Sequence, residues 1–425
     1  MSNDSITIAV DAMGGENSPL KVLKGIELFC KKNSGVKIII FGNKDYIEDE
    51  IKTKKIIIDN YEIHNTTENV NDNDNANTIL RSRKNSSIFK GLEYVKNNSN
   101  SGFVSAGNTA AIMILSRLHL GMIKGIDRPA ICSLIPNQNN YSLMLDLGAN
   151  VTVTPSNLLQ FALMGYCYFS IINSKKKPTI GILNIGTENN KGLEFLQEAS
   201  DLISKSFLSK YFIGFVEPNK ITSGQCDIIV SDGYTGNIML KSAEGISNFI
   251  TSNLRSLFEK SYLNKIAYKI IEKDLVQFKN KVNPDIYNGA TLIGLNGISI
   301  KSHGNANSIA FSHAIKQCFN FISNDLNKPS PNQNASSKIS EYLDLSQNGV
   351  SGEFEEYLNI GGQKEIAEAR SRGINSNTGI NESGEMMEGI LYVYGIEARQ
   401  KDLTKRIILL LILISGIFFL KRTIN

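Results

Sequence analysis

The sequence predicts a three-layer α/β/α, Rossmann-like fold on a mostly parallel sheet. Over residues 6–325, short apolar runs rich in β-branched side chains alternate with helical stretches. Turns rich in Gly and Asn separate the runs from the helical stretches. Short continuous apolar runs are typical of strands that are buried on both faces, and strand–helix alternation places helices on both sides of a parallel sheet.

Each element follows from a local pattern. Seven short apolar runs predict buried strands. They cover residues 6–10, 36–41, 103–105, 143–147, 179–185, 212–216 and 227–231. Six longer stretches with apolar residues at helical spacing predict helices. They cover residues 19–32, 78–96, 109–120, 156–172, 193–208 and 236–258.

Two further segments of the α/β part have a distinctive composition. Residues 65–77 are mostly Asn, Asp and Thr, which predicts a flexible excursion. Residues 262–281 carry many lysines, with apolar side chains at helical spacing. That pattern fits an ordinary helix packed on the core or on a partner, and also a protruding helical hairpin that contacts another subunit or a membrane surface.

The C-terminal part departs from the α/β pattern. We expect an α/β domain over residues 1–327, a linker and weakly ordered polar extension over 328–403, and an apolar C-terminal helix over 404–425. The apolar run 407–420 would span about 21 Å as a helix, less than the ~30 Å hydrocarbon core of a bilayer. Flanking Lys and Arg residues could extend its reach by snorkelling. The run therefore fits a membrane anchor or an interfacial or buried helix.

Composition excludes several classes of function. The net charge of +4, from 45 Lys and Arg against 41 Asp and Glu, is too small to indicate a nucleic-acid-binding protein. The five cysteines are scattered without a CxxC pair, and the four histidines form no HxxxH pair. We therefore expect no disulfide framework and no metal site, and a reducing compartment. The N-terminus lacks a charged-then-apolar leader, so we expect a cytoplasmic protein.

Six turns at predicted strand ends share one chemical character. Each combines Gly or Asn with a charged or hydroxyl side chain, and glycine turns that open helices direct backbone N–H groups and a helix dipole at an anion. The turns are residues 11–15, 105–109, 146–150, 184–187, 231–237 and 301–304. One such turn is weak support, because glycine turns occur in every α/β protein. Several at equivalent strand ends predict a shared anion site.

The turns carry neither of the common nucleotide fingerprints. No G-x-G-x-x-G opens the first helix, no G-x-x-x-x-G-K-[ST] occurs, and no G-x-S-x-G elbow is present. We therefore expect no dinucleotide, ATP or other cofactor, and no Ser-His-Asp chemistry. The turns offer amides, carboxamides, hydroxyls and Lys191, which suit the binding of an oxyanion and an inorganic anion.

The order of these motifs resembles that of the phosphate acyltransferase family (PlsX). The motifs are AVDAMGG, SAGNTA, KGIDRPA, LDLGANV, FALMG, LNIGTE..KG, FIGFVE, SDGYTGN, NGATLIGLNG and KSHG. The resemblance covers residues 6–325 and says nothing of the tail. It implies transfer of a long acyl chain from acyl carrier protein to inorganic phosphate, for the first acylation of glycerol 3-phosphate. It also implies a homodimer held peripherally at the cytoplasmic membrane by protruding helices, near the membrane glycerol-3-phosphate acyltransferase.

The resemblance also implies roles for particular residues. The Lys of the KG turn and the Asn of the TGN turn, here Lys191 and Asn237, are the catalytic candidates together with Asn108. We expect phosphate among the amides of Gly14, Gly15 and Gly107, with Asn108 and Lys191 beside it, and Asn237 at the oxyanion. The wider set of predicted phosphate- and acyl-binding residues is Asp11, Gly14, Gly15, Ser105, Gly107, Thr109, Asp146, Asn150, Asp232, Gly236 and His303.

Alternative interpretations apply to several of these residues. Asp11, Asp146, Asp232 and Asn108 fit structural caps as well, and His303 fits a structural hydrogen-bonding role. Compared with the family pattern, Glu16 replaces an Asp, Thr78 replaces a basic residue and Asn288 replaces a glycine. Rival functions are a phosphate acetyl- or acyltransferase that uses acyl-CoA, a decarboxylating dehydrogenase, and a non-catalytic membrane-tethered partner of the glycerol-3-phosphate acylation system.

Overall fold

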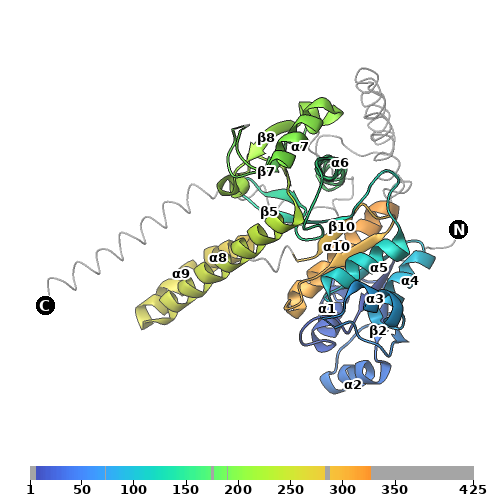
Figure 1. Ribbon diagram of the computed structural model, residues 1–425. Coiled ribbons are helices and arrows are strands. Elements are labelled where there is room, and N and C mark those ends of the chain that lie inside the picture. Colours follow the sequence, from blue (N-terminus) through green and yellow to red (C-terminus); the bar gives the residue numbers. More distant parts are fainter. Residues whose placement is uncertain (1–5, 72, 174–176, 189, 283–287, 327–425) are drawn as a thin grey trace, which may run out of the picture. The chain divides into compact units, whose positions relative to one another are not determined.

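The computed structural model describes residues 6–71, 73–173, 177–188, 190–282 and 288–326 (Figure 1). Residues 266–278 belong to a compact unit separate from the other described residues. The expectations for residues 328–403 and 404–425, including the apolar run 407–420, lie outside the described residues. No helix among the described residues is long and apolar enough to span a bilayer.

The elements of the described chain alternate between strands and helices. The strands are β1 (Thr7–Asp11), β2 (Lys37–Gly42), β3 (Tyr61–Asn65), β4 (Ser101–Ser105), β5 (Ala130–Pro136), β6 (Tyr141–Leu145), β7 (Ile180–Leu183), β8 (Phe212–Val216), β9 (Ile228–Val230), β10 (Ala290–Ile293) and β11 (Ile298–Lys301). The helices are α1 (Leu20–Cys30), α2 (Lys44–Lys54), α3 (Ala76–Ser82), α4 (Ser87–Asn97), α5 (Thr109–Leu120), α6 (Pro155–Ile172), α7 (Glu194–Lys205), α8 (Gly233–Glu259), α9 (Tyr262–Val282) and α10 (Ser308–Leu326), with 3₁₀ turns η1 (Phe207–Lys210) and η2 (Pro218–Ser223).

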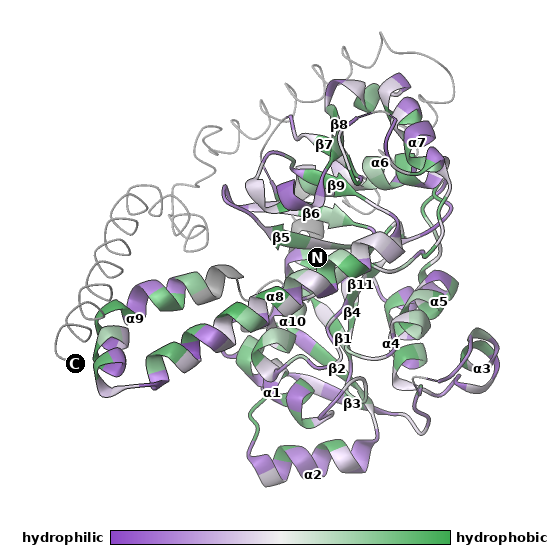
Figure 2. Ribbon diagram, turned by 60° about the vertical axis from the view of Figure 1, so that its left-hand side comes forward, coloured by the Kyte–Doolittle hydropathy of each residue, from purple (hydrophilic) through white to green (hydrophobic). Residues whose placement is uncertain are grey.

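The described strands form one sheet in the order β3-β2-β1-β4-β11-β10-β5-β6-β9-β7-β8 (Figure 2). The neighbours are parallel except at β11–β10, β10–β5 and β5–β6. The prediction of a mostly parallel α/β sheet is therefore confirmed. The three antiparallel steps reverse the chain direction, so β6, β9, β7 and β8 run opposite to β1, β2, β3, β4 and β11.

The register brings the carboxyl ends of both halves of the sheet to one line. Along that line the paired residues are Val10, Val104, Ile300, Thr291, Cys132, Leu145 and Val230. Val10 lies one residue before the end of β1, whereas Leu145 and Val230 are the last residues of β6 and β9. Since the halves run in opposite directions, the strands of one half lie on one side of this line and the strands of the other half lie on the opposite side. The turns that follow β1, β4 and β11 therefore begin on the same line across the sheet as those that follow β6 and β9.

Period-two alternation in the strands builds a core on each face of the sheet. Ile8 and Val10 point into one cluster of buried residues, which includes side chains of α1 and α10. Ala9 lies in the other, with side chains of α3, α4 and α5. These helices form the outer layers on the β1–β4–β11 half, as the three-layer prediction requires.

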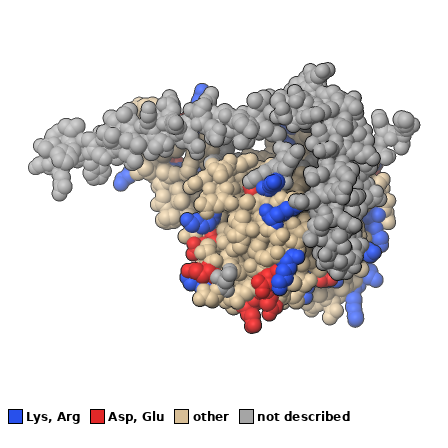
Figure 3. Space-filling model, turned by 90° about the horizontal axis from the view of Figure 1, so that it is seen from above, with Lys and Arg blue, Asp and Glu red and all other residues tan. Residues whose placement is uncertain are grey.

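Helix α2 packs on the core through few side chains. Helix α2 is strongly hydrophilic along its length (Figure 2), and only Ile47 of its side chains is buried. On the face drawn in Figure 3, acidic and basic side chains are interspersed with uncharged surface. The view agrees with the small net charge of the sequence.

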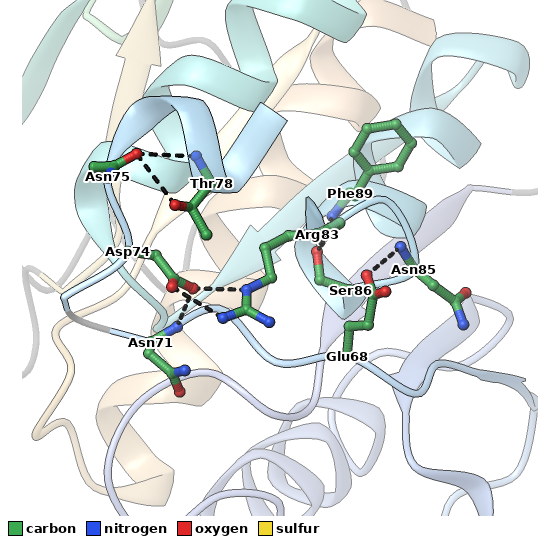
Figure 4. Close-up of polar contacts among 9 residues, drawn as sticks. All are labelled: Glu68, Asn71, Asp74, Asn75, Thr78, Arg83, Asn85, Ser86 and Phe89. Atoms are coloured by element: carbon green, nitrogen blue, oxygen red, sulfur yellow. Dashed lines mark hydrogen bonds and ion pairs between the residues drawn. The ribbon is translucent and has the colours of Figure 1, made fainter. Parts of the chain in front are cut away.

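The polar segment after β3 carries more hydrogen-bonded structure than a flexible excursion implies. Asp74 accepts two hydrogen bonds from the Arg83 guanidinium, at 2.8 and 2.9 Å (Figure 4). The Ser86 hydroxyl caps α4 by accepting from the Phe89 amide at 3.3 Å. These contacts divide the single helix predicted over 78–96 into α3 and α4. Thr78 lies in the first turn of α3, where its N–H and hydroxyl both donate to Asn75.

Candidate active site

A first group of turns follows β1, β4 and β11, and Asp11 lies at its centre. One carboxylate oxygen of the fully buried Asp11 accepts from the amides of Met13 and Gly14, at 3.0 and 3.1 Å. The other oxygen accepts from the Ser105 hydroxyl at 2.6 Å. The Ser105 hydroxyl oxygen in turn accepts from the Gly107 amide at 2.9 Å. Asp11 and Ser105 thus hold the turns after two adjacent strands against each other.

This arrangement uses some donors that the sequence assigned to phosphate. The amides of Gly14 and Gly107 donate to Asp11 and Ser105. The carboxamide oxygen of Asn108 caps α5 by accepting from the Ala111 amide at 2.9 Å. Thr109 is the exposed first residue of α5. The structure therefore gives Asp11, Ser105 and Asn108 turn-shaping contacts, which are compatible with a second role for their neighbours.

A buried lysine lies beneath the first group of turns. Lys21, on the first turn of α1, exposes 5% of its surface and donates to the Gly304 carbonyl. The Glu16 amide donates to the same carbonyl oxygen at 2.9 Å. Gly15 has a φ of +82°, and a Cβ there would lie 2.6 Å from the Lys21 ammonium. Burial lowers the pKa of Lys21, and the negative charges of Glu16 and Asp11 oppose that shift.

A second group of turns follows β6 and β9, and Asp146 organises it as Asp11 organises the first. One carboxylate oxygen of the fully buried Asp146 accepts from the amides of Ile131, Gly148 and Ala149, at 3.0, 3.2 and 2.9 Å. The other accepts from the backbone and side-chain nitrogens of Asn150, at 2.7 and 2.9 Å. Burial raises the pKa of Asp146, and the hydrogen bonds from these N–H groups oppose that shift.

Helix α8 begins against this second group. Asp232 caps it by accepting from the amide and hydroxyl of Thr235, at 2.8 and 2.7 Å. Gly236 packs so closely on the Asp146 carbonyl that a Cβ would overlap its oxygen. Asn237 is exposed on the next position, and a Cβ built at Gly148 would lie 3.6 Å from its side chain. Asn237 thus stands at the amino end of a helix, beside the Gly148 turn, where backbone amides and the helix dipole favour negative charge.

A histidine–carboxylate contact connects the turn after β11 to α8, the helix of the second group. His303, in the turn after β11, lies with Nε2 3.2 Å from the Glu244 carboxylate on α8. Glu244 and Asn237 are seven residues apart on that helix and so share a face. The buried Asn288 supports the His303 turn by accepting from the His303 amide at 3.0 Å and donating to Ser302 and Ala310, each at 2.8 Å. The departure at Asn288 therefore has a structural purpose.

The turn after β7 presents Lys191. Its ammonium donates to the Glu188 carboxylate at 2.9 Å, and both side chains are about half exposed, at 51% and 55%. Glu188 raises the pKa of Lys191. The buried Asn184 shapes the turn by donating to the Lys191 carbonyl at 2.9 Å and accepting from the Ile185 amide at 2.8 Å. The contacts described for the Lys191 side chain are local to its own turn.

The structure therefore assembles most of the predicted residues in two joined groups. The first group contains Asp11, Gly14, Gly15, Ser105, Gly107, Asn108, Thr109 and His303, and the second contains Asp146, Asn150, Asp232, Gly236 and Asn237. Lys191 belongs to a third turn. Sequence reasoning missed the positions of Lys21 and Glu244. A lysine in a helical pattern gives no sign of burial. The one available signal was that Lys21 lies only eight residues after Met13, in the turn that follows the first predicted strand.

Comparison with known proteins adds an independent finding. The model of a family described as "Fatty acid synthesis protein" matches residues 6–329. A phosphate acyltransferase from Clostridium tetani is 41% identical over 314 residues, covering 74% of this chain and 93% of that protein. One from Pelagibacter ubique is 38% identical over 322 residues, covering 76% and 96%. A solved phosphotransacetylase from Streptococcus pyogenes superposes with a TM-score of 0.49 and 17% identity, covering 75% of this chain and 95% of that one.

Proposed function

Because the chain belongs to the phosphate acyltransferase family, we propose that it transfers a fatty acyl group from acyl carrier protein to inorganic phosphate, giving an acyl phosphate for phospholipid synthesis. The chain is an acyltransferase, and phosphate acyltransfer is the activity of its family. The carrier-protein donor and the role in phospholipid synthesis are the parts that we add. The observation that carries the proposal is the pairing of the two groups of turns through His303 and Glu244.

The reaction is a single displacement. A phosphate oxygen attacks the carbonyl carbon of the thioester, and the carbonyl oxygen becomes the oxyanion of a tetrahedral intermediate. The C–S bond then breaks, the acyl phosphate departs, and the thiolate of the carrier takes up a proton. Since a thiol of this kind has a pKa near 8.5, it leaves with little help from a general acid.

The two groups of turns divide this work. Phosphate is proposed to bind at the first group, over the Gly14–Gly15 turn, and Lys191, which lies on the separate turn after β7, is the second proposed cation. The thioester carbonyl lies at the amino end of α8, where Asn237 and the helix amides stabilise the oxyanion. Removing one such donor typically costs about 100- to 1,000-fold in kcat. Asn237→Ala should therefore lower kcat by about that factor while the KM for phosphate changes little.

The experiment that tests the function measures thiol release from palmitoyl-carrier protein by the full chain, with and without phosphate. We expect release that requires phosphate and yields palmitoyl phosphate. Release at the same rate without phosphate, or a trapped acyl-enzyme, would contradict the single displacement. Replacing the donor by palmitoyl-CoA decides between the two thioesters: turnover with CoA alone would assign the chain to the acyl-CoA alternative.

Exposed apolar side chains support the proposed homodimer and membrane surface. On α8, Ile246 and Phe249 expose 60% and 68% of their surface. On α9, Tyr262 and Ile270 expose 80% and 78%. Patches of this kind mark contacts with proteins or lipids. Sedimentation of the chain alone and flotation with anionic vesicles would distinguish the two, and a monomer that ignores vesicles would contradict both.

A further inference from the structure

Lys21 is buried in a place that is electrostatically unfavourable for an isolated cation. It is the second residue of α1, where the positive end of the helix dipole repels a positive charge. It exposes only 5% of its surface, so it has lost most of its hydration. A lysine in such a position needs compensating partners. Those partners identify what the charge is for.

The partners of Lys21 all belong to the first group of turns. Its ammonium donates to the Gly304 carbonyl in the turn after β11. The negative charges that favour its protonated form are Glu16 and Asp11. A Cβ at the exposed Gly15 would lie 2.6 Å from the ammonium, 2.7 Å from the Gly304 carbonyl oxygen and 2.9 Å from that of Ala106. The ammonium thus lies directly beneath the turn on which phosphate is proposed to bind.

Without a cation the first group of turns would repel an anion. Asp11 is fully buried, and its described hydrogen-bond donors, two amides and a hydroxyl, carry no charge. Two carbonyl oxygens, from Ala106 and Gly304, also face the space beneath Gly15. A phosphate dianion above this turn would meet a net negative potential, and partial burial would strengthen the repulsion. The buried Lys21 ammonium cancels one unit of that negative charge and so lessens the repulsion.

We propose that Lys21 is a positioning residue of the phosphate subsite, which offsets one unit of the negative charge of Asp11 and Glu16 from beneath Gly15 and fastens the turn after β1 to the turn after β11. It acts through the turns and the local potential. Lys191, which is half exposed and paired with Glu188, cannot supply this buried charge. The inference rests on the proposed function in one respect, that phosphate is the anion.

The test compares Lys21→Met with Lys24→Met in the full chain. Lys24 lies on the same helix but is exposed, so its substitution is a matched control. Steady-state kinetics with phosphate and palmitoyl-carrier protein varied in turn give both KM values. For Lys21→Met we expect the phosphate KM to rise about tenfold or more, the loss of one partly screened charge interaction, while the carrier-protein KM stays unchanged. Lys24→Met should match the wild type.

A second measurement does not depend on turnover. Inorganic phosphate should raise the melting temperature of the wild-type chain relative to chloride at equal ionic strength, because a ligand of the folded state stabilises it. Lys21→Met should lose this shift and Lys24→Met should keep it. If Lys21→Met does not fold, Lys21→Gln replaces it, since Gln retains a donor for the Gly304 carbonyl without the charge.

Two outcomes would overturn the inference. One is a neutral variant that keeps the wild-type phosphate KM and the phosphate-induced shift. The other is a variant with lower kcat and melting temperature but both KM values unchanged, which would make Lys21 purely structural. These outcomes are distinct from failure of the proposed function, which would appear in the wild type as thiol release independent of phosphate.

Discussion

Two glycines of one helix offer a direct test of how α8 is seated on the second group of turns. Gly236 lies in the first turn of α8, and a Cβ there would overlap the Asp146 carbonyl oxygen and lie 2.7 Å from the Ser231 hydroxyl. Gly245 lies on the same helix with nothing within 4 Å of an added Cβ. The same substitution to Ala should therefore have opposite effects at the two positions.

The size of each effect follows from these contacts. Since the added Cβ would lie 1.9 Å from the Asp146 oxygen and carbon contacts favour about 3.5 Å, the start of α8 would have to move by roughly 1.5 Å to accept Ala at position 236. The neighbour is backbone, which cannot rotate away, so we expect a loss of about 3 kcal/mol of unfolding free energy. A displacement of this size at Asn237 should cost about 100-fold in kcat/KM. Gly245→Ala should instead stabilise by about 0.5–1 kcal/mol, because Ala is the better helix former.

The assay pairs urea unfolding, followed by circular dichroism, with phosphate-dependent thiol release. Gly245→Ala controls for the effect of an added methyl group on the helix itself. The reasoning would be refuted if Gly236→Ala were as stable and as active as Gly245→Ala. It would be refuted in part if Gly236→Ala lost stability but kept full activity, because the position of Asn237 would then not depend on this contact.

Three further predictions follow from the buried and paired groups. Asp146→Asn should lower the unfolding free energy by roughly 2–6 kcal/mol, because two N–H groups of Asn150 lose their acceptor; exposed Asp49→Asn is the control in the same urea titration. Glu188→Gln should bring the pKa of Lys191 back down, because Glu188 raises it. The phosphate KM should therefore begin to rise at a lower alkaline pH in the variant than in the wild type. If the KM of both proteins rose at the same pH, the pairing of Lys191 with Glu188 would be contradicted. Burial raises the pKa of Cys30 to about 11, and the other four cysteines are buried, so a thiolate-specific reagent near pH 8 should label the native chain slowly and all five cysteines after unfolding.

The parts of the fold that the sequence predicted well are those specified by local signals. Helix α5 has the predicted bounds because Asn108 caps its start and Gly121, with a φ of +70°, follows its end. The prediction missed α2, β3, β5, β10 and α10. Helix α2 has one buried side chain, and the residues of β3 are almost all exposed, so neither has the apolar pattern that burial imposes.

Local sequence patterns could not predict that the two halves of the sheet run in opposite directions. The residue pattern of β6, β9 or β7 is the same whether the neighbouring strands run parallel or antiparallel to it. Direction is decided by β5 and β10, and their pairing with each other, Thr291 opposite Cys132, joins strands far apart in the sequence. The register then determines whether the turns of the two halves meet, and register is a tertiary property.

The candidate site shows the same division. The glycine turns were evident because a turn needs residues of particular types close together in the chain. The burial of Lys21 was not, because the carbonyl that it binds lies 283 residues away. The contact of His303 with Glu244 likewise joins the turn after β11 to a helix that no local pattern places beside it. Residues that act through distant partners escape sequence reasoning.

The two groups of turns repeat one construction but differ in charge, and that difference assigns the two reactants. In each, an Asp at a strand end is fully buried and accepts backbone amides of the turn that it begins. The Lys21 ammonium, the one buried Lys or Arg group among the residues that the structure describes, lies beneath the first group. A phosphate that arrives with its full charge is therefore better held by the first group. The thioester carbonyl is neutral when it binds and becomes negative only in the transition state, so it suits the second group, where Asn237 and the α8 dipole act on charge as it develops.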